Sequence, residues 1–114
     1  MYAMYLREQG LAIVVMDDPD EAFRQAAQMD LIVTGIRLRA ASDGLTLITR
    51  LRQNEATRST PIIVLTACAF DEDRARAMTA GCNSFLPKPC PPGELFAEVQ
   101  KLLAKSRGSR DEAL

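Results

Sequence analysis

The chain contains no histidine and no tryptophan. Without histidine, it lacks the commonest general base and the commonest metal ligand of proteins. Cysteine is scarce too: there are three, Cys68, Cys82 and Cys90, and none are in Cys-x-x-Cys spacing. This odd count and spacing argue against a disulfide framework and against a zinc site. We therefore expect reduced thiols in a cytoplasmic protein that has no metal site and no cofactor.

An excess of charge of one sign is also missing. The 14 basic and 15 acidic residues give a net charge of −1, so the sequence offers no electrostatic basis for binding nucleic acid or an anionic membrane. The longest apolar runs, such as 11–16, are far too short to span a bilayer. No N-terminal segment has the pattern of a secretory signal. We expect neither nucleic acid nor membrane as a partner.

What is present is a regular alternation of two patterns. Short apolar runs rich in β-branched residues alternate with amphipathic stretches, which predicts an α/β fold with a parallel sheet flanked by helices. The 114 residues allow one domain, which we place at 1–105, followed by a polar C-terminal tail at 106–114 that frays. The predicted strands are 11–16, 31–34, 62–66 and 83–86, and the predicted helices are 1–9, 18–29, 45–53, 71–81 and 91–105.

Capping residues support these helix limits. Asp18 followed by Pro19 predicts a helix N-terminus, and Asp71 predicts another. Gly10 follows the first predicted helix and Gly81 closes the fourth, and both glycines indicate where these helices end. The second helix is expected to bury Ala22, Phe23, Ala26 and Ala27, and the last helix Leu95, Phe96, Val99, Leu102 and Leu103. A loop is expected at 37–43.

Three segments resemble the receiver domain of two-component response regulators. They are Asp30–Leu38 with the following Asp43-Gly44-Leu45, Thr60–Ala67, and Ala80–Pro89, which contains Leu-Pro-Lys-Pro. Their order and spacing are similar to those of the family, and the resemblance covers about Met4 to Lys105. It implies a flavodoxin-like fold in which the family has five parallel strands, and a phosphoryl group carried by an Asp at the end of the middle strand.

That chemistry needs a carboxylate nucleophile, an acidic pair that holds Mg²⁺, a lysine and a hydroxyl group. The resemblance places Lys88 and Thr66 at the family's lysine and hydroxyl positions, and Phe85 at its aromatic switch position. Thr66 is equally well explained as a strand-end residue, and for Phe85 plain packing is the simpler interpretation. Gly35 stands where the family has its phosphoacceptor Asp. No acyl phosphate can form on glycine, and we expect the chain to have no catalytic residue and not to be an enzyme.

The acidic pair has no counterpart either. The resemblance aligns residues 1–10 with the family's first helix and 11–16 with its second strand, so that the family's first strand is missing. Asp17 and Asp18 look like the acidic pair, but only 18 positions separate Asp17 from Gly35, which is room for one helix. An N-cap and a solvated turn explain both better.

In the family the first strand lies between the second and third strands, so its loss would open the sheet. Three explanations remain: a gene start set too late, a sequence shorter than the native chain, or a fold that compensates. Compensation means direct pairing of the remaining strands or a homodimer that covers the seam. An apolar face carrying Tyr2 and Tyr5 is explained by core packing or by such a dimer.

These observations predict a degenerate receiver-like domain that acts in a two-component phosphorelay through protein contacts, without Asp phosphorylation. The resemblance implies that about 71–105 contacts a histidine kinase or a downstream effector. An alternative is a flavodoxin-like module that binds a small molecule or an anion in the strand-end cleft, with Thr66 and Lys88 as ligands. No glycine-rich phosphate loop supports this alternative.

Overall fold

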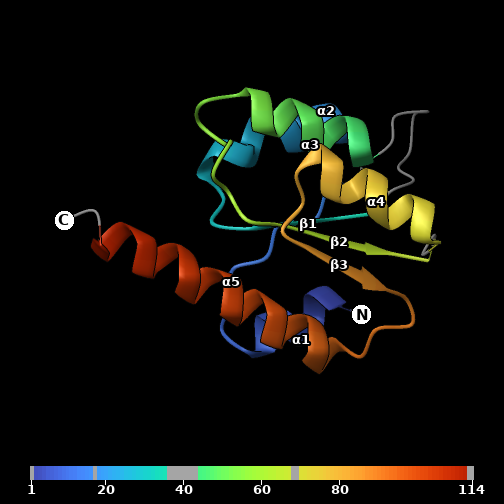
Figure 1. Cartoon of the computed structure of the whole chain (residues 1–114). Helices are drawn as coiled ribbons and strands as arrows, with labels where there is room; N and C mark the ends of the chain where they lie inside the picture. The colour runs from blue at the N-terminus through green and yellow to red at the C-terminus, as the bar shows by residue number, and fades with distance from the viewer. Residues whose placement is uncertain (1, 17, 36–43, 68–69, 113–114) are drawn as a thin grey trace.

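Three parallel strands lie between two layers of helices in the computed structural model, which describes residues 2–16, 18–35, 44–67 and 70–112 (Figure 1). Helices α2, α3 and α4 cover one face of the sheet, and α1 and α5 cover the other. In chain order the elements are α1 (Tyr2–Glu8), α2 (Pro19–Gln25), a 3₁₀ turn (Ala26–Gln28), β1 (Ile32–Thr34), α3 (Gly44–Gln53), β2 (Ile62–Thr66), α4 (Asp71–Ala80), β3 (Ser84–Pro87) and α5 (Pro92–Glu112).

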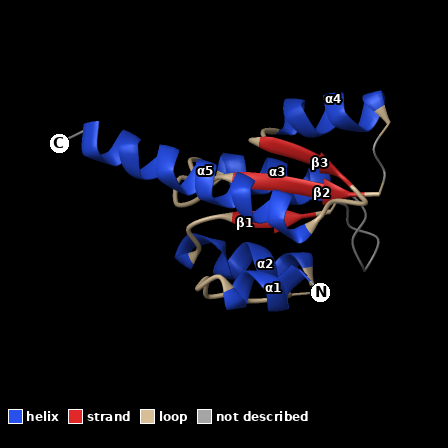
Figure 2. Cartoon of the chain, turned by 90° about the horizontal axis from the view of Figure 1, so that it is seen from below, coloured by secondary structure: helices blue, strands red, loops and turns tan. Residues whose placement is uncertain are grey.

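The sheet has the order β1-β2-β3. Ile32 pairs with Ile62 and Val64 pairs with Phe85, both in parallel register. All five residues of β2 are buried, as expected for a central strand covered on both faces. Figure 2 shows β1 and β3 as the two outer strands of the described sheet. The predicted α/β fold with a parallel sheet between helices is confirmed.

The predicted strand at 11–16 is wrong, because the described residues contain three strands and this segment belongs to none of them. Val14 and Val15, expected in the core, are 56% and 65% exposed. The resemblance implies that this segment pairs with the family's first strand, and no such strand is among the described residues. A single extended run has no means of satisfying its backbone groups except with a neighbouring strand or water. Direct pairing of this segment with the remaining strands, one of the expected compensations, is not observed.

Most helix limits agree with the sequence signals. Asp18 caps α2 by accepting a hydrogen bond from the amide of Asp20 at 3.0 Å. Gly81 ends α4 with a φ of +118°, a left-handed conformation that favours glycine. Asp71 does not cap α4, however. It is the first helical residue, and the carboxylate of Asp73 instead accepts a hydrogen bond from the amide of Phe70 at 3.3 Å.

Two further helix predictions need correction. The α-helix α2 stops at Gln25 and continues as a 3₁₀ turn, which leaves Ala27 exposed although it was expected to be buried. The backbone of α5 is helical through Glu112, and so it extends into the segment expected to be a frayed tail. The domain limit at 105 stays a prediction. The predicted loop at 37–43 lies outside the described residues.

The sheet separates two clusters of buried side chains. One joins α2, α3 and α4 to the sheet around Ile48, Leu51 and Ile62, all 0% exposed. The other joins α1 and α5 to Ile63 on the opposite face of β2. As predicted, α5 contributes Leu95, Val99 and Leu102 as buried residues, while Phe96 and Leu103 are partly buried at its margin.

Candidate signalling site at the carboxyl ends of the strands

The strands bring the predicted site residues to one edge of the sheet. Thr66 is the last residue of β2 and pairs with Pro87, the last residue of β3. The amide of Lys88 donates a hydrogen bond to the carbonyl oxygen of Thr66 at 2.8 Å. Gly35 directly follows β1, whose residue Thr34 pairs with Val64 of β2. The expectation that these positions share the carboxyl edge of the sheet is confirmed.

Thr66 and Phe85 are largely buried, with 5% and 7% of their surfaces exposed. The Phe85 side chain belongs to the cluster beneath α3 and α4. The guanidinium carbon of Arg74 lies 5.0 Å from the centre of its ring, a cation–π distance. Phe85 therefore packs in the core of this structure, and the Arg74 guanidinium of α4 lies over its ring.

Lys88 is exposed, and its side chain lies toward α1. Its amino nitrogen is 6.0 Å from the centre of the Tyr2 ring. The Tyr2 hydroxyl donates a hydrogen bond of 2.7 Å to the carbonyl oxygen of Cys90, and Tyr5 makes an edge-to-face contact with Phe96 of α5. Tyr2 and Tyr5 thus pack α1 against α5 and against the segment that precedes α5. This agrees with core packing as the explanation of the apolar face that carries both tyrosines.

Gly35 contributes only backbone to the site. Its carbonyl oxygen accepts a hydrogen bond of 3.1 Å from the hydroxyl of Thr34. Gly44, the first residue of α3, packs against the same carbonyl group so closely that a Cβ atom there would lie 1.7 Å from the oxygen. The main chain of Gly35 and α3 are therefore in direct contact, at the position where, the resemblance implies, the family carries its phosphoacceptor.

The acidic residues near this edge are only partly described. Asp18 is exposed and caps α2, and Asp30 lies before β1, at the opposite end of that strand. Asp17, Asp43 and Cys68 lie outside the described residues. Within the described residues, no three side chains among Asp, Glu, His and Cys gather as metal ligands.

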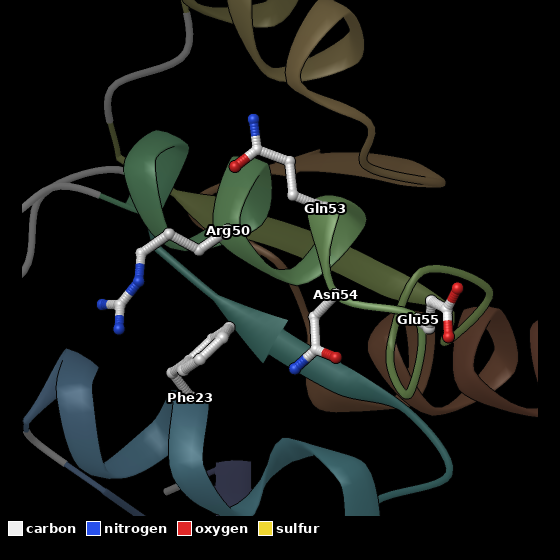
Figure 3. Close-up of a pocket in the computed structure, with 5 residues that line it drawn as sticks. All are labelled: Phe23, Arg50, Gln53, Asn54 and Glu55. Carbon is white, nitrogen blue, oxygen red and sulfur yellow. The ribbon is translucent and has the colours of Figure 1, made fainter.

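Two cavities lie among the described residues, and the described residues that line them do not include Thr66 or Lys88. The larger, of about 490 Å³, is an open depression between α2 and the end of α3, lined by Phe23, Arg50, Gln53, Asn54 and Glu55 (Figure 3). The Arg50 guanidinium lies 4.3 Å from the centre of the Phe23 ring and pairs with Asp20 at 2.9 Å. The second, of about 280 Å³, runs along β1 and reaches Gly35.

Arg52 of α3 has an extensive set of polar contacts that no sequence signal indicated. Its guanidinium donates to the carbonyl oxygens of Thr57, Arg58, Thr60 and Gly81 and to the side-chain oxygen of Asn83, over 2.7–3.3 Å. The same Asn83 oxygen accepts from the amide of Ile62 at 2.8 Å. No motif marks this site, because its acceptors come from two separate segments of the chain, 57–60 and 81–83.

Burial changes the acidity of groups around this arginine. Desolvation lowers the pKa of Arg52, although the nearby Cys82 thiol opposes the shift. Desolvation also raises the pKa of Cys82, against the favourable field of Arg52, and raises that of Cys90, where Glu94 adds to the effect. Both thiols are therefore kept in the protonated, unreactive form at neutral pH.

The expected partner surface, 71–105, forms one continuous side of the molecule. It consists of α4, the edge strand β3 and the first part of α5, which lie next to one another (Figure 1). The Ser84 hydroxyl on β3 donates a hydrogen bond to the Glu98 carboxylate on α5. The exposed residues of the surface 71–105 include Met78, which is 50% exposed. They also include charged residues of both signs: Asp71, Glu72, Arg74, Arg76, Glu94 and Lys101.

The chain belongs to the response regulator receiver domain family, whose sequence model matches residues 1–100. Receivers are signalling modules, and the flavodoxin-like fold expected here is theirs. The chain is similar to the phosphate regulon transcriptional regulatory protein PhoB of Escherichia coli, with 31% identity over 92% of this chain and 46% of PhoB. It is also similar to the probable transcriptional regulator ycf29 of Pyropia yezoensis, with 33% identity over 89% of this chain and 46% of the relative.

Solved structures agree with this assignment. A response regulator from Chloroflexus aurantiacus superimposes with a TM-score of 0.82 at 32% identity, covering 90% of this chain and 84% of the other. The magnesium-bound receiver domain of the sensor histidine kinase PA1611 from Pseudomonas aeruginosa gives 0.77 at 34% identity, covering 87% and 82%. The chain spans less than half the length of the curated relatives named above. None of the described helices combines the length and the apolar character that a membrane span requires.

Proposed function

We propose that this receiver domain is degenerate and works in two-component signalling through protein contacts, without phosphorylation of an aspartate. The observation that carries the proposal is Gly35. It sits at the carboxyl end of β1, on the sheet edge that also carries Thr66 and Lys88. A phosphoryl acceptor needs a carboxylate at that point, and glycine offers only a main-chain carbonyl group.

The rest of the family's switch is consistent with a domain held in one state. In receivers, the resemblance implies, the hydroxyl and the aromatic residue respond to the phosphoryl group. Here Phe85 is packed in the core under Arg74, and its rotation outward would expose an apolar ring to water. Because no phosphoryl group would form at Gly35, no contact would favour a second conformation of Thr66 and Phe85 over the one observed.

The partner would be a histidine kinase or a downstream effector that contacts 71–105. Several features of this side suit a protein interface: it has an exposed apolar residue, Met78, among charges of both signs, and it consists of an edge strand flanked by two helices. The two relatives described above are regulators of transcription by name, and this chain spans only part of their length. A cytoplasmic location remains a prediction.

Beryllofluoride with Mg²⁺, which imitates a phosphoryl group on a receiver aspartate, tests the proposal by NMR. We expect the amide signals of Thr66, Phe85 and Lys88 to stay unchanged. The amide signals at the corresponding positions of the PhoB receiver domain, the control, should shift under the same conditions. A saturable shift of these three signals would contradict it. Inorganic phosphate without Mg²⁺ forms a second arm: saturable shifts at Thr66 and Lys88 there would favour the anion-binding alternative instead.

A further inference from the structure

Helix α4 lies at the margin of the molecule, beside α3 and the edge strand β3 (Figure 2). Ala77 is the one buried residue among the ten that form α4, whereas α3 buries five of its ten residues. Because an alanine side chain removes little apolar surface from water, the hydrophobic effect holds α4 on the domain more weakly than it holds α3. Elements with few buried apolar side chains are the ones that open locally.

The C-terminal end of α4 is fixed by polar contacts. The carbonyl oxygen of Gly81 accepts a hydrogen bond of 2.9 Å from Nε of Arg52. The side-chain oxygen of Asn83 accepts from the Arg52 guanidinium at 2.9 Å and from the amide of Ile62 at 2.8 Å. The amide of Asn83 donates in turn to the carbonyl oxygen of Ile62 at 2.7 Å. This end of the helix is therefore tied both to α3 and to β2.

The N-terminal half of α4 is attached differently. Among the described residues, no hydrogen bond joins 70–76 to another element. Asp71 and Glu72 are exposed, and Phe70, which precedes the helix, is 77% exposed. The contact with the sheet is made by Arg74, whose guanidinium carbon lies 5.0 Å from the centre of the Phe85 ring on β3.

This contact between Arg74 and Phe85 covers a buried aromatic ring from outside. Phe85 is 7% exposed and belongs to the apolar cluster that also contains Ile48 and Ile62. A planar guanidinium stacks well on an aromatic face and is attracted by it. Arg74 forms no ion pair with the described residues, so the Phe85 ring is what positions its guanidinium.

We propose that α4 is a hinged helix, with Gly81 as the hinge and Arg74 as the latch. When the Arg74 guanidinium leaves the Phe85 ring, the N-terminal half of α4 moves away from the sheet, while the anchored end keeps its hydrogen bonds. Residues at the end of an element are those that absorb such a change of direction, and Gly81, with a φ of +118°, ends α4. The observed position is the closed one, and the open one uncovers Phe85.

The hinge gives a partner on the surface 71–105 two positions of α4 to distinguish. A ligand shifts such an equilibrium by the difference between its affinities for the two positions. A partner that binds the open position more tightly would therefore uncover Phe85 without any phosphoryl group. This step rests on the proposed function, which supplies the partner surface. The hinge and the latch belong to the chain itself and are tested without a partner.

NMR relaxation dispersion on the purified chain tests the latch, because it detects minor states that exchange within microseconds to milliseconds. Arg74→Ala should raise the population of the open state about two- to fivefold, the effect of losing one exposed cation–π contact. The exchange should be confined to the amides of 71–75 and of Phe85. Arg76→Ala is the matched control: Arg76 is exposed on the same helix, has no aromatic contact among the described residues, and should behave as wild type. Arg74→Lys, which keeps a cation, should give an intermediate population.

A second background shows whether Arg74 acts through the ring. In Phe85→Leu, the further change Arg74→Ala should leave the exchange as it is. A further rise in that background, no exchange in Arg74→Ala, or equal exchange in Arg74→Ala and Arg76→Ala would overturn the latch. Exchange that extends through Gly81 and Asn83 would overturn the hinge, because the whole helix would then move. A phosphoryl adduct on the chain would refute the proposed function and leave the hinge and the latch standing.

Discussion

The carbonyl oxygen of Gly35 occupies the space in which a side chain at Gly44 would begin. A Cβ atom on Gly44 would lie 1.7 Å from that oxygen and 3.2 Å from the hydroxyl oxygen of Thr34. The first turn of α3 thus rests directly on the main chain that follows β1. This contact fixes the backbone at the position where active receivers, according to the family resemblance, carry their phosphoacceptor.

Gly44→Ala should therefore destabilise the domain by about 1–3 kcal/mol, since the obstacle is backbone and has to shift. Gly93→Ala is the matched control. A Cβ atom at Gly93 would meet only the Tyr5 hydroxyl, at 3.6 Å, which is an ordinary contact. The control should be neutral or stabilise the helix by up to about 1 kcal/mol. Equal urea midpoints for both variants would show that α3 does not press on Gly35.

Arg52→Ala should cost about 3 kcal/mol of unfolding free energy, because it leaves several carbonyl oxygens without their charged donor. Arg50→Ala, two residues away on the same helix, is the control, and the Asp20 partner of Arg50 is exposed. Loss of this exposed ion pair should lower the unfolding free energy by no more than about 1 kcal/mol. A double-mutant cycle with Asn83→Ala should give a coupling of about 1–2 kcal/mol between Arg52 and Asn83. Additive losses would mean that the two side chains act independently.

Tyr2→Phe should lower stability by about 1 kcal/mol, the usual net value of one hydrogen bond, because it removes the donor to the Cys90 carbonyl group. Tyr5→Phe keeps the edge-to-face contact with Phe96 and should be close to neutral. Thermal unfolding of the two variants side by side measures the difference. If Tyr2→Phe is also neutral, α1 is held by apolar contact alone.

The unfolding free energy should fall as the pH rises above about 9. Burial raises the pKa of Cys82 and Cys90 from an ordinary 9.0, so the folded chain keeps thiol protons that the unfolded chain releases. The contribution is complete below the unfolded pKa and is lost as the pH rises toward the folded pKa. Urea unfolding at several alkaline pH values should show a shallower decline for Cys82→Ala than for wild type. Parallel declines would refute the assignment to this thiol.

How far the sequence predicts this structure depends on how local each signal is. Helix ends marked by Asp18 and Gly81 were predicted correctly, because a cap acts within one turn. Strand β2 was also predicted, since a run of apolar β-branched residues suits a central strand. The run 11–16 has an equally strong pattern and forms no strand, because a strand depends on a neighbour elsewhere in the chain.

In the candidate site, too, some features could be predicted from the sequence and others could not. Resemblance placed Thr66 and Lys88 correctly at one sheet edge, and the register brings them together. The Arg52 network and the contact between Gly35 and Gly44 could not be predicted. Each depends on how separate elements of the fold meet in space, and neither has a characteristic residue spacing.

The central claim is that this receiver cannot take up a phosphoryl group. Incubation with acetyl phosphate and Mg²⁺, followed by intact-mass spectrometry, tests it most directly, with the PhoB receiver domain as the active control. We predict no added mass on this chain under conditions that modify the control. A stoichiometric phosphoryl adduct that hydroxylamine removes would contradict the account, because a carboxylate other than the missing one at Gly35 would then be the acceptor.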